Sequence, residues 1–134
     1  MGNTALSLKE REKELTAARF VRACKDQGWI VLDDGDSFTV RQASPAGEDF
    51  LFTVEKSNAI QDTITFAAYY DADEHAAQLI PFRGTNGVPE RISVLLDDAY
   101  AIGDMLSGLE AALWDAETAL NEDLYRMDCE DDNK

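Results

Sequence analysis

The chain begins with a helical spacing of apolar residues. Between Ser7 and Gly28, apolar side chains recur every three or four residues, which predicts an amphipathic helix. Ser7 and Glu10 have the spacing of a capping box at the start of this helix, and Gly28 is a natural stop after its end. The pattern therefore predicts one N-terminal helix.

Four short segments then alternate apolar and polar residues, and turn residues separate them. They are WIVLD at 29–33, SFTVRQ at 37–42, DFLFTVEK at 49–56 and DTITFAAYY at 62–70. A period of two is typical of strands with one buried face, and Asp34-Gly35 is a hairpin signal. Because the connections are short, we expect a four-stranded antiparallel meander.

The last third of the chain carries the longest helical pattern. After a short helix predicted at 71–80 and a loop at 81–90, apolar residues recur from Ile92 to Leu120 at alternating spacings of three and four. A helix of this length would be about 43 Å long, which exceeds the dimensions of a compact domain of this size. Three arrangements therefore stay open: the helix packs across the sheet, pairs its distal half with a second copy, or breaks at Gly103 or Gly108. The residues that would form the dimer seam are Leu106, Leu109, Leu113, Ala116 and Leu120.

These elements together predict an α+β fold. We expect an N-terminal helix, a four-stranded antiparallel meander, a short helix and a long C-terminal helix packed on one sheet face. The length of 134 residues and the 45% hydrophobic content suit one domain with a real core, which we place at residues 1–126. Residues 127–134 end in CEDDNK and predict an acidic, disordered tail.

Charge is the strongest compositional feature, because the formal net charge is −15. From residue 92 to the end there are 12 acidic and 2 basic residues, whereas residues 7–27 hold four acidic and six basic ones. A chain this acidic repels the phosphate backbone of nucleic acid. Direct binding of nucleic acid is therefore disfavoured.

A helix that displays carboxylates every one or two turns spaces its charges roughly as a nucleic acid spaces its phosphates. The expected partner is therefore a basic protein surface, such as the nucleic-acid groove of a defence nuclease. The simpler interpretation is a solvated helix face that only keeps the chain soluble. The acids predicted to bind the partner are Asp97, Asp98, Asp104, Glu110, Asp115, Glu117 and Glu122.

Signals for catalysis or metal binding are weak. Asp71, Asp73 and His75 could bind a divalent cation, but acidic residues also suit the start of a helix. The loop RGTNGVP is neither a dinucleotide-binding fingerprint nor a Walker A motif. Cys24 and Cys129 lack the spacing of a zinc site. We therefore expect a protein that is not an enzyme and uses no cofactor or metal.

The same features predict a cytoplasmic location. The sequence has no apolar run long enough to span a membrane, and its charged N-terminus lacks the apolar core of a secretory signal. Two isolated cysteines are typical of a reducing compartment.

Three stretches between residues 69 and 113 form a recognisable set: YDADEH, RGTNGVP and LLDDAYAI. In these stretches the chain resembles small acidic proteins, of no assigned activity, that phages and conjugative elements of gut Gram-positive bacteria carry. Small acidic proteins of mobile elements include anti-CRISPR and anti-restriction inhibitors that occupy nucleic-acid grooves. The resemblance thus implies a non-catalytic inhibitor of a host protein. The alternative is a homo-oligomeric structural or accessory protein, a homodimer that uses the C-terminal helix as its seam.

Overall fold

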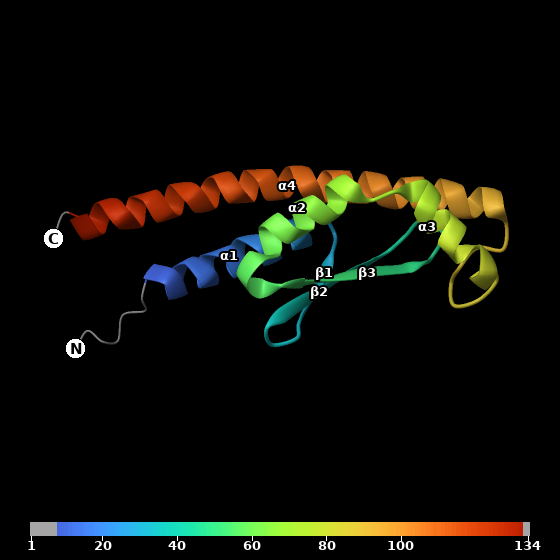
Figure 1. Cartoon of the computed structure of the whole chain (residues 1–134), viewed down its shortest axis with the longest axis horizontal. Coiled ribbons are helices and arrows are strands. Elements are labelled where there is room, and N and C mark those ends of the chain that lie inside the picture. Colours follow the sequence, from blue (N-terminus) through green and yellow to red (C-terminus); the bar gives the residue numbers. More distant parts are fainter. Residues whose placement is uncertain (1–7, 133–134) are drawn as a thin grey trace.

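A computed structural model describes residues 8–132, with side chains from 9 to 127, and shows an α+β fold (Figure 1). The elements are α1 (Leu8–Asp26), β1 (Ile30–Asp33), β2 (Ser37–Ala43), β3 (Asp49–Glu55), the 3-10 helix η2 (Lys56–Asn58), α2 (Ala59–Tyr69), α3 (Ala72–Leu79), the 3-10 helix η3 (Ile80–Phe82) and α4 (Ile92–Asp132). Figure 1 shows α4 along one side of the molecule and the sheet on the opposite side, with α1 and α2 between them. The predicted fold class is confirmed. The predicted capping residue Ser7 lies outside the described residues.

The three strands form an antiparallel sheet in the order β1-β2-β3. In the register of β2 and β3, Phe38 pairs with Val54 and Val40 with Phe52, so apolar side chains of neighbouring strands lie side by side. The buried residues of this inner face are Phe38, Val40, Phe50, Phe52 and Val54. The predicted alternation therefore holds for β2 and β3, because one face meets the core and the other meets water.

The predicted fourth strand is wrong, because residues 62–70 lie in helix α2 and its end. The buried residues of α2 are Ala59, Ile60, Thr63 and Ile64. These form two adjacent pairs four positions apart, which is the repeat of a helix face. Phe66 stacks on Phe52 with ring centroids 4.6 Å apart, so α2 covers the sheet instead of extending it.

Helix α4 runs without a break for 41 residues. Gly103 and Gly108 do not break it; an added Cβ would lie 3.6 Å from the Tyr70 ring at the first and 3.1 Å from Gln27 Oε1 at the second. The helix also continues through residues 127–132, where the sequence predicts disorder, while residues 133–134 lie outside the description. Over residues 8–132, no helix combines the length and the apolar character that crossing a membrane requires.

The inner stripe of α4 is buried within the chain. Leu106, Leu109 and Leu113 are fully buried and Leu120 nearly so, and Ala116 packs against the same core. The predicted dimer seam is therefore an intramolecular one, filled by α1 and α2. The prediction that α4 lies directly on the sheet also needs correction, since α4 packs mainly against α1, α2 and α3.

Truncation of the inner stripe should destabilise the fold. Leu106→Ala leaves a cavity in the core, and we expect a loss of about 2–5 kcal/mol in the free energy of unfolding. The control is Leu51→Ala, because Leu51 is exposed on the outer face of the sheet, and we expect it to cost under about 1 kcal/mol. Urea unfolding followed by circular dichroism measures both, and equal losses would contradict the assigned burial.

The buried thiol of Cys24 supplies a test that depends on pH. Burial raises the pKa of Cys24 from 9.0 to about 12, so the reactive thiolate is scarce in the folded protein. In a Cys129→Ser variant, Cys24 should react with an aromatic disulfide reagent at about pH 8 only after unfolding. Because the folded pKa is the higher one, ionisation favours the unfolded state, and stability should fall as the pH rises from about 9 towards about 12. Rapid labelling of the folded chain would contradict this burial.

Candidate functional site

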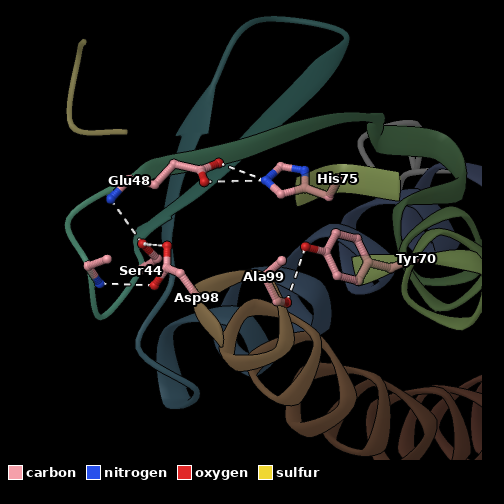
Figure 2. Close-up of polar contacts among 7 residues, drawn as sticks. Ser44, Glu48, Tyr70, His75, Asp98 and Ala99 are labelled. Atoms are coloured by element: carbon pink, nitrogen blue, oxygen red, sulfur yellow. Dashed lines mark hydrogen bonds and ion pairs between the residues drawn. The ribbon is translucent and has the colours of Figure 1, made fainter. Parts of the chain in front are cut away.

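A polar cluster joins the loop between β2 and β3 to helix α4 (Figure 2). Asp98 of α4 is only 5% exposed, and its carboxylate accepts hydrogen bonds from the Ser44 hydroxyl at 2.6 Å and from the Ala46 N–H at 2.9 Å. The Ser44 hydroxyl oxygen in turn accepts from the Glu48 N–H at 2.9 Å. A buried carboxylate needs such donors, so Asp98 and this loop fix one another in place.

The same cluster reaches α3 through a contact between an imidazole and a carboxylate. His75 Nε2 lies 3.0 Å from Glu48 Oε2, with both side chains mostly buried, and Figure 2 shows the imidazole and the carboxylate facing each other. The His75 ring also packs edge-on against Phe50, with centroids 5.6 Å apart. The sequence pattern did not reveal Glu48 as the partner of the single histidine, because the two residues come together only through the fold.

Tyr70 completes the cluster at the end of α2. Its hydroxyl donates to the Ala99 carbonyl at 3.3 Å (Figure 2). Burial, reinforced by the nearby carboxylates of Glu48, Asp98 and Asp71, raises the pKa of Tyr70 well above its usual range. The hydroxyl therefore stays protonated at neutral pH and serves as a donor to α4.

The three residues that the sequence offered as possible metal ligands, Asp71, Asp73 and His75, contact different partners. Asp71 caps α3 by accepting from the Glu74 N–H at 3.1 Å, Asp73 accepts from the Tyr100 hydroxyl at 2.8 Å, and His75 pairs with Glu48. The hydrogen bond to Asp73 raises the pKa of Tyr100. Within the described part of the chain, no three His, Cys, Asp or Glu side chains converge as a metal site would need.

The cluster of Figure 2 also lacks the geometry of a nucleophilic triad. The Ser44 hydroxyl donates to Asp98, whereas His75 contacts Glu48, so no imidazole is placed to take a proton from the serine. Its polar groups bind one another and join four parts of the fold: the β2–β3 loop, the end of α2, α3 and α4. We interpret it as the clamp that fixes how α4 is rotated against the rest of the chain.

The seven acids predicted to bind the partner differ in their exposure. One is buried, two are partly buried and four are exposed. Asp98 is wrong as a surface residue, because it belongs to the clamp. Glu110 and Glu117 are partly buried; the first accepts from Trp114 Nε1 at 3.4 Å and the second from the Gln61 amide. These three carboxylates are therefore engaged within the chain.

The remaining four acids form one exposed row. Asp97, Asp104, Asp115 and Glu122 are all exposed, at successive spacings of 7, 11 and 7 residues. At about 100° per residue these spacings keep the four side chains within about 20° of one another, opposite the buried leucines. The row spans about 37 Å at about 1.5 Å per residue. We call these four residues the outer acidic row.

Sequence reasoning missed two features of α4. Asp123 pairs with Arg19 at 2.7 Å, so one acid of the C-terminal segment ties α4 to α1. In addition, three exposed aromatic residues lie beside the outer acidic row, and we call them the aromatic row. They are Tyr100, Trp114 and Tyr125, which are 51%, 50% and 72% exposed. Their spacings of 14 and 11 residues were the available signal, since both are close to whole numbers of helical turns.

Comparison of the chain with protein-family models, with curated proteins and with solved structures found no match.

Loss of the Asp98 carboxylate should weaken the clamp. Asp98→Ala leaves the Ser44 hydroxyl and the Ala46 N–H without their buried acceptor, and we expect a loss of about 2–3 kcal/mol. The matched control is its neighbour Asp97, which is exposed, so Asp97→Ala should stay within about 0.5 kcal/mol of the parent. Urea unfolding gives both values, and hydrogen exchange at the Ala46 amide should accelerate only when Asp98 is removed. Similar values for the two variants would refute the clamp.

Proposed function

We propose that this chain is a non-catalytic interaction protein whose outer acidic row binds the basic, nucleic-acid-binding groove of a partner protein. The observation that carries the proposal is the display of four carboxylates on one face of an unbroken helix. The clamp and the buried leucines fix this face outward, so the charges are presented in a set geometry. Arranged charge of one sign is what steers a protein to a complementary surface.

The spacing of the outer acidic row supports a partner whose groove normally binds the phosphates of a nucleic acid. Neighbouring acids of the row are about 10, 16 and 10 Å apart along the axis, at about 1.5 Å per residue. Phosphates along one strand recur about every 3.4 Å of helix axis. The carboxylates of the row are more widely spaced, so each would take the place of one phosphate and skip the next few along the strand. The flexible side chains of lysine and arginine can span such differences. Occupation of the groove would exclude nucleic acid, which is how an anti-restriction or anti-CRISPR protein of a mobile element would inhibit a host nuclease.

Two alternative functions, direct binding of nucleic acid and homodimerisation through α4, have less support. A net charge of −15 opposes direct binding of nucleic acid. A homodimer built on the stripe from Leu106 to Leu120 would need residues that the chain already buries, so self-association would have to use another surface.

Neutralisation of the outer acidic row should weaken binding to a basic probe. The variant combines Asp97→Asn, Asp104→Asn, Asp115→Asn and Glu122→Gln, and the probe is a short peptide that alternates lysine and arginine. If each exposed contact contributes about 0.5 kcal/mol, the loss sums to about 2 kcal/mol, or about thirtyfold in Kd. Fluorescence anisotropy at two salt concentrations measures this loss and its expected weakening at higher salt.

The control changes the net charge equally but leaves the outer acidic row intact. It combines Glu12→Gln, Asp36→Asn, Glu55→Gln and Glu90→Gln, all at exposed positions outside α4. We expect it to lose less than about threefold in affinity, because screened charges far from a contact contribute little. Equal losses in the two variants would mean that net charge alone attracts the peptide, and the proposal would fail.

A further inference from the structure

The solvent side of α4 holds more than carboxylates. The aromatic row follows the outer acidic row along the helix, and at about 100° per residue its three side chains lie within about 40° of one another. Large exposed aromatic side chains are enriched in protein interfaces and in their energetic hot spots. On this face of α4, rings and carboxylates lie side by side.

Carboxylates lie next to the rings. The Tyr100 hydroxyl donates to Asp73, and Trp114 Nε1 donates to Glu110. Along the whole of α4, from Ile92 to Asp132, the only basic residue is Arg126. An apolar partner that covered the rings would also strip water from these carboxylates without replacing it, which is unfavourable.

A groove between α4 and the ends of α2 and α3 extends the same surface. Its volume is about 620 Å³, and Tyr69, Tyr100, Asp104 and Glu110 are among its lining residues. None of the described residues that line it is a lysine or an arginine. Asp104 belongs both to this groove and to the outer acidic row, so the two surfaces are continuous.

Building on the proposed function, we propose that the aromatic row of α4 docks arginine side chains of the basic partner, with Trp114 as the central contact. A guanidinium group is planar, so it can stack on a ring while its edge donates two hydrogen bonds to a neighbouring carboxylate. The ammonium of lysine is a compact and strongly hydrated charge that gains less from a ring. The juxtaposition of ring and carboxylate along α4 therefore selects arginine over lysine.

The test compares two short peptides of equal length and charge, one of alternating arginine and glycine and one of alternating lysine and glycine. The chain has two tryptophans; Trp29 is only 2% exposed and Trp114 is 50% exposed, so quenching by the neutral reagent acrylamide reports mainly on Trp114. We expect the arginine peptide to bind at least about threefold more tightly than the lysine peptide and to protect Trp114 from the quencher.

The variant Trp114→Ala with Tyr125→Ala should lower affinity for the arginine peptide by about fivefold or more and leave the lysine peptide almost unchanged. The control is Phe82→Ala, an exposed aromatic residue in η3, which should alter neither affinity. Circular dichroism and unfolding midpoints that match the parent confirm that the variants fold.

The outcomes separate this inference from the proposed function. If both peptides bind equally and Trp114 stays open to the quencher, while neutralisation of the outer acidic row still weakens binding, then the arginine selectivity is refuted and the acidic surface stands. If an apolar peptide protects Trp114 better than the arginine peptide does, the inference is also overturned. If neither basic peptide distinguishes the row variant from its charge-matched control, the proposed function itself fails.

Discussion

The structure depends on the burial of one narrow stripe of α4. Leu106, Leu109 and Leu113 are fully buried in the core that α4 forms with α1 and α2, and this packing removes them from water. Because a helix is rigid across its diameter, burial of one side forces the opposite side outward. The exposure of Asp97, Asp104, Asp115 and Glu122 is thus a consequence of where the leucines lie.

The clamp adds a second constraint near the start of α4. Among the α4 carboxylates that the structure describes, Asp98 is the one buried against backbone and hydroxyl donors of the β2–β3 loop. Helix α3 is joined to the same loop through Glu48 and His75. Two neighbouring residues of identical chemistry, Asp97 and Asp98, therefore have opposite roles. One is part of the interior, and the other belongs to the surface that we propose to bind a partner.

Sequence reasoning succeeded where a single pattern decided the outcome. The alternation of β2 and β3 has one buried set and one exposed set, and the structure follows it. It failed at α2, because a run of threonines and apolar residues satisfies a period of two as well as a helical one, and only the preceding pair Ala59 and Ile60 distinguishes them. The stacking of Phe66 on Phe52 then favours the helix through contacts that no local pattern contains.

The candidate surface was only partly predictable for the same reason. The spacing of acidic residues in the sequence identified the acids of α4. It did not reveal that Asp98 would accept a hydrogen bond from Ser44 or that Asp123 would form an ion pair with Arg19. Such pairings join residues distant in sequence, so they depend on tertiary structure. The aromatic row, by contrast, had a spacing that could have been read directly from the sequence.

The continuity of α4 has a geometric consequence for any partner. A row of charges that stays on one side of a rod for about 37 Å can touch a surface at every point only if that surface is nearly straight over the same length. A strongly curved cleft would leave some of the four carboxylates in water. If the proposed function holds, α4 would therefore bind a basic surface of matching shape more tightly than a strongly curved one of equal charge.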